Sequence, residues 1–308
     1  MRIVFFGTPV FAASILRFLL DAQTLISAVV TRPDRPQGRS QKLMPSALKH
    51  YIVKEHPSIP VLQPEKATDP VFLEKLKEIG ADLFVVVAFG QILPQTLLDI
   101  PAKGCINIHA SLLPKYRGAA PMQRCLLNGD KETGVAIQKM VKQLDAGDVI
   151  ATAKIEILPD MTLGELQQEL CDLAKPLLLL VLQSYESGIP PAEPQDHDRA
   201  TYAPKISVEE GEINWERPAI ELHNLIRAFS PKPGAWSWVY LPNGEKRRIK
   251  ILRTILADDS GKQGAFLSTD GTVACGTKSL KILELQPEGK TVMKARDWLI
   301  GFRDLPHF

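Results

Sequence analysis

The sequence has few cysteines and no long hydrophobic run. Its four cysteines are widely separated within apolar segments, at Cys105, Cys125, Cys171 and Cys275. This spacing excludes a CxxC metal site and a small disulfide framework, so we expect buried free thiols. Nowhere do about 18 apolar residues follow one another, and the chain enters a strand-like run directly from Met1, without a charged leader and cleavage site. We therefore expect a cytoplasmic protein without a membrane span.

The chain also lacks a large net charge of either sign. The 308 residues carry 37 Lys and Arg against 35 Asp and Glu, and 45% are hydrophobic. These values are ordinary for a globular protein with a sizeable core, and the length exceeds one average domain. We therefore expect two domains.

The beginning of the chain lacks the Gly-x-Gly-x-x-Gly fingerprint of a dinucleotide site. Apolar runs at 3–6 and 25–30 flank an amphipathic segment at 11–20, which predicts a βαβ unit. The run at 83–88 is apolar without alternation, as in a strand covered on both faces of a parallel sheet. The first half is therefore predicted to be an α/β domain with a mostly parallel sheet and no dinucleotide site after its first strand.

A polar pair ends a short apolar strand in the middle of this domain. Asn107 and His109 alternate with the apolar residues of 105–108, so both side chains should lie on one face. Residues 110–121 then carry the Ser, Pro and Gly of a loop that can hold chemistry. Taken alone, the pair fits a hydrogen-bonded strand cap as well as a catalytic site.

An acidic turn at 144–148 separates the strand-like runs 134–140 and 149–157. Such a turn needs no role beyond solubility. Asp145 gains one if the fold brings it beside His109, because a carboxylate bonded to an imidazole fixes the tautomer and raises the basicity.

A long connection at 31–45 carries the cations Arg32, Arg35, Arg39 and Lys42. Its length and charge make it a candidate for phosphate contact, and a solvated loop is the alternative.

The second half has a different pattern. Residues 163–187 predict a long helix interrupted at Pro176. The segment 188–199, which carries three prolines and several polar residues, predicts a semi-rigid linker. A helix is predicted at 220–228. Short strands are predicted at 236–241, 248–255, 264–268, 272–276 and 279–285, separated by turn signals. This pattern indicates a small antiparallel sheet or barrel.

A basic hairpin lies within this second domain. From residue 204 onward there are 16 Lys or Arg against 13 Asp or Glu, and the excess concentrates on Lys246, Arg247, Arg248, Lys250 and Arg253. An OB-like barrel with such a patch is a reasonable nucleic-acid module, and a solvated strand face is the alternative.

Taken together, these motifs resemble those of a known family. Asn107, His109, Ser111-Leu112-Leu113-Pro114 and Asp145 are similar to the active-site constellation of folate-dependent formyltransferases. The longer string 111–121 resembles that of the members that formylate methionyl-tRNA. Further matches lie at 6–9, 33–36, 144–148, 202–206 and 230–236, so the resemblance covers almost the whole chain. Ser40-Gln41 departs from the pattern, which leaves the conformation of that loop open.

The resemblance implies a Rossmann-like formyltransferase domain at 1–188, a linker at 189–203 and an OB-like tRNA-binding domain at 204–308. It implies 10-formyltetrahydrofolate as formyl donor, initiator methionyl-tRNA as acceptor, no metal and no obligate protein partner. Asn107 would stabilise an oxyanion, His109 would share that role or move a proton, and Asp145 would orient His109 and help to deprotonate the amine.

Binding residues follow from the same resemblance. Backbone groups expected to hold the folate are those of Phe89, Gly90, Gln91, Ile92, Leu93, Ser111, Leu112, Leu113 and Pro114. The residues expected to contact tRNA are Arg39, Lys42, Lys246, Arg247 and Arg248. Three alternatives stay open: a glycinamide ribonucleotide formyltransferase, which would need no second domain, a sugar-nucleotide formyltransferase, and a non-catalytic RNA-binding relative.

Overall fold

The computed structural model describes residues 1–37 and 41–308, which form two compact units. The first unit comprises Met1–Gly118, Gly134–Ile155 and Gln168–Tyr202. The second comprises Ala119–Thr133, Glu156–Gln167 and Ala203–Phe308. Two short segments from within residues 1–188 therefore belong to the second unit.

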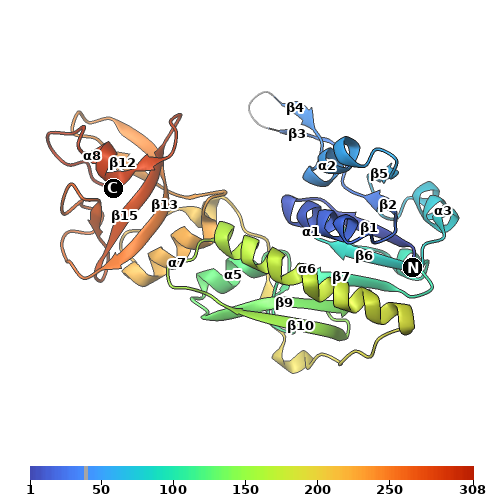
Figure 1. Cartoon of the computed structure of the whole chain (residues 1–308). Coiled ribbons are helices and arrows are strands. Elements are labelled where there is room, and N and C mark those ends of the chain that lie inside the picture. Colours follow the sequence, from blue (N-terminus) through green and yellow to red (C-terminus); the bar gives the residue numbers. More distant parts are fainter. Residues whose placement is uncertain (38–40) are drawn as a thin grey trace. The chain divides into compact units, whose positions relative to one another are not determined.

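The first unit is built around a seven-stranded sheet with the order β10-β9-β7-β6-β1-β2-β5 (Figure 1). Its strands are β1 (Ile3–Gly7), β2 (Ile26–Val30), β5 (Val61–Leu62), β6 (Leu83–Val87), β7 (Cys105–His109), β9 (Glu132–Lys139) and β10 (Val149–Glu156). Neighbours from β5 to β7 pair in parallel, whereas β9 runs antiparallel to β7. The predicted α/β class with a mostly parallel sheet is confirmed.

Helices accompany this sheet. They are α1 (Val10–Asp21), α2 (Ala47–Glu55), α3 (Pro70–Ile79), α4 (Gln95–Leu98) and α6 (Leu163–Ser187). The predicted interruption at Pro176 is wrong, because α6 continues through that residue. Proline removes one backbone donor, but buried side chains on both sides, including Leu170 and Leu178, keep one apolar face packed along the helix.

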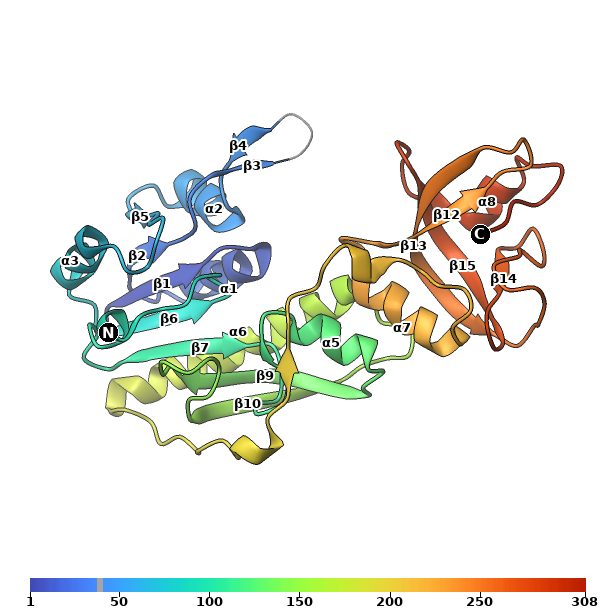
Figure 2. The same ribbon diagram turned by 180° about the vertical axis from the view of Figure 1, so that it is seen from behind.

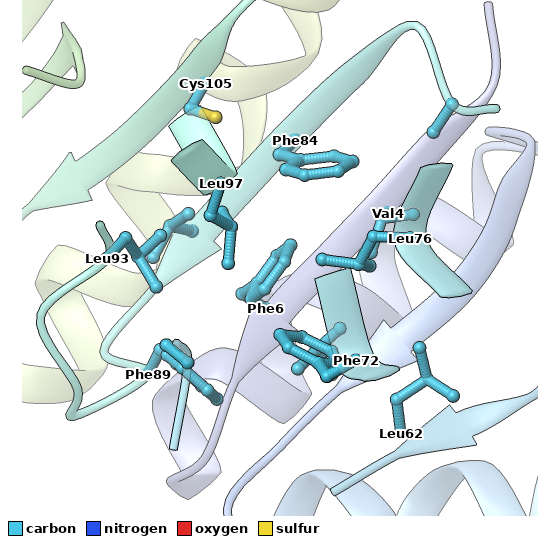
Figure 3. Packing of buried hydrophobic residues seen from close by; sticks show 14 of the residues in the cluster. Val4, Phe6, Leu62, Phe72, Leu76, Phe84, Phe89, Leu93, Leu97 and Cys105 are labelled. Carbon is cyan, nitrogen blue, oxygen red and sulfur yellow. The ribbon is translucent and has the colours of Figure 1, made fainter. Parts of the chain in front are cut away.

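The core beside β1 and β6 is aromatic. Phe6 lies between Phe84 and Phe89, with ring centroids at 5.2 and 5.5 Å, and Phe72 and Leu76 of α3 belong to the same cluster (Figure 3). Every residue of β1 and β6 is buried, which explains why their apolar runs show no alternation. This packing gives β7, the next strand, a rigid support.

The connection 31–45 contains a short hairpin rather than a wholly irregular loop. Strand β3 (Arg35–Gln37) pairs antiparallel with β4 (Lys42–Met44), and the hairpin extends away from the sheet in both views (Figures 1 and 2). All three residues of β4 are exposed. Arg39 lies outside the described residues.

The second unit contains an antiparallel sheet with the order β12-β13-β15-β14, and β16 pairs with β15 (Figure 2). The strands are β12 (Ala235–Tyr240), β13 (Lys246–Ala257), β14 (Thr272–Ala274), β15 (Ser279–Pro287) and β16 (Met293–Lys294). The helices are α5 (Pro121–Leu127), α7 (Ala219–Phe229) and α8 (Ala295–Leu299). Shorter elements elsewhere in the chain are β8 (Arg117–Gly118), β11 (Tyr202–Ala203) and the 3-10 turns His197–Arg199 and Glu209–Gly211.

The strand predicted at 264–268 is wrong. This segment forms only isolated bridges, Ala265 with His307 and Phe266 with Val273, because Gly264 turns the chain at φ +75°. Throughout residues 1–37 and 41–308, no helix combines the length and the apolarity that crossing a bilayer requires.

Candidate active site

The polar pair lies on β7, between the parallel neighbour β6 and the antiparallel neighbour β9. The register sets Asn107 against Val86 on one side and against Gln138 on the other. His109, two residues further on, is paired with Ala136. Both polar side chains contact the same carboxylate, that of Asp145, so they share one face of the strand.

The Asp145 carboxylate is the centre of this cluster. Its Oδ1 accepts hydrogen bonds from Gln138 Nε2 at 3.0 Å and from Asn107 Nδ2 at 3.4 Å. Its Oδ2 accepts from the Gly118 amide at 2.8 Å and lies 3.6 Å from His109 Nδ1. The side chain is only 11% exposed, and the residue adopts φ +48°. The fold therefore meets the condition under which Asp145 was expected to matter.

The environment of His109 fixes its tautomer. Nε2 lies 2.9 Å from the Tyr116 carbonyl oxygen, and because a carbonyl only accepts, Nε2 carries a proton. Nδ1 faces Asp145 Oδ2 at 3.6 Å, which is longer than a hydrogen bond. The imidazole is 6% exposed and both of its nitrogens face protein groups. His109 is therefore held beside Asp145 in a fixed orientation.

A buried hydrogen-bond network supports the turn that carries Asp145. Arg117 is 1% exposed and donates from Nε and Nη2 to Gln195 Oε1, at 3.1 and 2.7 Å. Gln195 Nε2 in turn donates to the carbonyl oxygens of Asp145 and Gly147, at 2.9 and 2.6 Å. The left-handed backbone of Asp145 is thus fixed by an amide that is itself held by a guanidinium.

The supporting residues were not predicted from the sequence. Gln138 left a signal, because it is a polar residue in the otherwise apolar run 134–140. Gln195 left none, since it lies in the segment that was expected to be a linker.

A cavity adjoins the cluster. It is lined by Gln91, Ile92 and Leu93, by Gln138 and Met140, and by residues 141–147, which include Asp145. Ile92 is 80% exposed and Leu144 is 56% exposed. Apolar side chains beside one carboxylate suit a flat, largely apolar ring system that carries a reacting polar group.

Only some of the residues expected to hold folate line this cavity. Gln91, Ile92 and Leu93 line the cavity. Phe89, next to Gly90, is buried in the core, and its carbonyl accepts from Thr8 Oγ1 at 2.9 Å. Ser111 is fully buried and donates to the Lys115 carbonyl at 2.6 Å. Leu112, Leu113 and Pro114 are half-buried and do not line this cavity.

The basic hairpin of the second unit divides into two kinds of cation. Lys246 Nζ lies 4.9 Å from the Trp238 ring centroid, and the Arg248 guanidinium lies 3.9 Å from that of Trp236. Arg247 instead donates to both carboxylate oxygens of Glu245, at 2.7 and 2.8 Å. Its charge is therefore compensated within the protein.

Two further cations of the hairpin are engaged within the same unit. Lys250 donates to the Pro233 carbonyl at 2.6 Å, and Arg253 forms an ion pair with Glu165. Among the residues that the structure describes, no group of three or more His, Cys, Asp or Glu is arranged to hold a metal ion.

Comparisons with known proteins agree with this fold. A model of the formyl transferase family matches residues 1–182, and a model of the formyl transferase C-terminal domain matches residues 205–303. The chain is 46% identical to "Methionyl-tRNA formyltransferase" of Protochlamydia amoebophila, covering 98% of this chain and 95% of the relative. It is 44% identical to the protein of that name from Chlamydia trachomatis serovar L2b, covering 98% and 96%.

Solved structures share the fold at lower identity. HypX from Aquifex aeolicus aligns with a TM-score of 0.69 at 16% identity, covering 99% of this chain, which spans 48% of the length of HypX. An N-formyltransferase from Helicobacter canadensis, solved with folinic acid and dTDP-3-aminofucose, aligns with a TM-score of 0.65 at 22% identity, covering 91% and 98%. From the two family models and the near-full-length identity, the chain belongs to the formyl transferase family.

Proposed function

We propose that this protein transfers the formyl group of 10-formyltetrahydrofolate to the α-amino group of methionyl-initiator tRNA. The product is N-formylmethionyl-tRNA for translation initiation. The observation that carries this is identity of 46% and 44% over nearly the whole length of relatives named methionyl-tRNA formyltransferase. A cytoplasmic location fits a translation enzyme.

The catalytic roles fall to Asn107, His109 and Asp145. The α-amine attacks the formyl carbon, and the bond from that carbon to N10 of the folate then breaks. Asp145 lines the cavity, so its carboxylate takes the proton that the attacking amine loses, and an equivalent proton goes to the departing N10. His109 is anchored by its Nε2 on the Tyr116 carbonyl and faces Asp145 Oδ2 with Nδ1 at 3.6 Å, so it keeps the carboxylate in place. Asn107 uses one N–H toward Asp145 at 3.4 Å, which leaves its other N–H for the oxyanion of the tetrahedral intermediate.

The folate donor supplies the formyl group, and the cavity beside Asp145 fits its ring system. Ile92 and Leu144 present apolar surface, while the backbone of 91–93 and 141–147 presents amide and carbonyl groups. The backbone of Phe89, Gly90 and 111–114 is assigned to folate binding on the family resemblance alone, because these residues do not line the cavity.

The tRNA contacts fall to exposed cations. Lys42 lies on the exposed strand β4, close in sequence to Arg39. Lys246 and Arg248 lie on β13. Arg247 is the weaker candidate of the hairpin, because Glu245 compensates its charge. Such contacts position the tRNA backbone without reading its sequence.

We assign one role to each of the predicted domains. Residues 1–188 carry the formyl transfer chemistry, 189–203 connect, and 204–308 bind tRNA. An OB-like closure of the second sheet is supported by bridges that join its edges. Tyr240 of β12 bridges to His307, His307 to Ala265, and Phe266 to Val273 of β14.

The test offers labelled 10-formyltetrahydrofolate with three separate acceptors: methionyl-initiator tRNA, a dTDP-amino sugar and glycinamide ribonucleotide. Label is expected on the tRNA alone. Transfer to either small amine at a comparable kcat/KM would overturn the assignment.

A further inference from the structure

One face of β12 carries a row of aromatic rings. Trp236, Trp238 and Tyr240 alternate with the buried residues Ala235, Ser237 and Val239. Trp238 is 39% exposed and Tyr240 is 40% exposed, which is unusual for rings that are easily buried. The row is therefore a surface feature and not part of the core.

Cations from β13 lie among these rings. The register pairs Trp238 with Arg248 and Tyr240 with Lys246. Lys246 Nζ is 4.9 Å from the Trp238 centroid and 5.3 Å from that of Tyr240, and Arg248 covers Trp236 at 3.9 Å. We call Trp236, Trp238, Tyr240, Lys246 and Arg248 the aromatic–basic face.

The charge of this face is not compensated. In the described part of the chain, no carboxylate pairs with Lys246 or Arg248, and Arg248 Nε has no hydrogen-bond partner. Arg247, between them in sequence, is neutralised by Glu245. Positive charge is thus kept at the rings and cancelled at the neighbouring position, which indicates an anionic ligand at the rings.

Tyr240 stacks with His307, with ring centroids 5.4 Å apart. We propose that the aromatic–basic face binds unpaired nucleotides of RNA, stacking one base on Trp238 and another against the Tyr240–His307 pair while Lys246 and Arg248 neutralise the adjacent phosphates. Exposed rings interleaved with cations are what single-stranded nucleic acid needs, whereas a duplex offers phosphates but no free base faces. The proposal rests on tRNA as the substrate and deepens it, since it assigns this face to a single-stranded part of that tRNA.

The test uses the full chain and three probes: initiator tRNA, oligouridylate and an RNA duplex of the same length. Trp238→Leu should weaken oligouridylate binding by roughly 5- to 150-fold, the cost of losing one stacked base. It should change duplex binding little. Trp238→Phe, which keeps a ring, should bind almost as wild type. Lys262→Ala is the control, because Lys262 is an exposed cation of the same unit that lies outside the aromatic–basic face, and it should leave oligouridylate affinity within about twofold.

Unchanged oligouridylate affinity in a folded Trp238→Leu variant would overturn the proposal, as would equal losses for oligouridylate and duplex. Tyr240→Leu replaces Trp238→Leu if thermal melting shows that the latter does not fold. Formylation of methionyl-tRNA by the wild type is measured in parallel. If the wild type binds RNA but transfers no formyl group, the proposed function is refuted. If transfer is normal and the variant binds oligouridylate like the wild type, only the RNA-binding role of the aromatic–basic face is refuted.

Discussion

Replacing Asp145 with Asn tests the catalytic cluster with little change in shape. The carboxylate accepts hydrogen bonds from Gly118, Gln138 and Asn107, and its Oδ2 faces His109. An amide has one acceptor and one donor end, so one end must place an N–H against an existing donor. It also cannot take a proton from the attacking amine. Turnover should therefore fall by about 10²–10⁴, the usual contribution of a positioned base.

The stability cost should be smaller than the catalytic one. One hydrogen bond to the carboxylate is lost or inverted, which costs about 1–3 kcal/mol. The assay compares single-turnover formylation at saturating tRNA and folate with the urea unfolding midpoint. Asp148→Asn is the matched control, because Asp148 belongs to the same turn but is exposed. It should keep normal turnover.

Turnover within about threefold of wild type in Asp145→Asn would refute this reasoning, since no carboxylate would then be needed. A loss in Asp148→Asn as large as that in Asp145→Asn would show instead that the turn is sensitive to any change of charge.

Three further predictions concern other parts of the chain. Lys42→Ala, on the exposed strand β4, should raise the KM for methionyl-tRNA several-fold while folate affinity stays constant; equal losses would place this hairpin at the folate. Burial lowers the pKa of His223, so below about pH 6.5 the unfolded chain binds a proton that the folded chain does not. The urea midpoint of unfolding should therefore fall as the pH is lowered through this range, and His223→Gln should remove this part of the pH dependence. Burial raises the pKa of Cys125 and of Cys275 to about 11, so both thiols should resist a thiol reagent at pH 8 until urea unfolds the protein; rapid native labelling would contradict this.

Local patterns predicted the strands because strand signals are local. The uninterrupted apolar run that became β6 and the alternation that became β7 each need only a few residues to be recognised. The same locality explains the errors. Pro176 breaks helices in isolation, yet packing of α6 on both sides of it prevails.

The site was predictable only in part because its contacts are distant in sequence. Asn107 and His109 share a strand, so their common face followed from periodicity. Asp145 could be joined to them only conditionally, since the antiparallel pairing of β9 with β7 brings it there. Arg117 and Gln195 are 78 residues apart and form hydrogen bonds in the buried interior. No local sequence pattern predicts such a pair.

The most direct test of the central claim identifies the atom that receives the formyl group. Wild-type protein is incubated with labelled 10-formyltetrahydrofolate and methionyl-initiator tRNA, the aminoacyl ester is hydrolysed, and the released amino acid is weighed by mass spectrometry. The account predicts labelled N-formylmethionine, which forms about 10²–10⁴ times more slowly in Asp145→Asn under single-turnover conditions. Released methionine without label, while a dTDP-amino sugar offered in parallel becomes formylated, would contradict it.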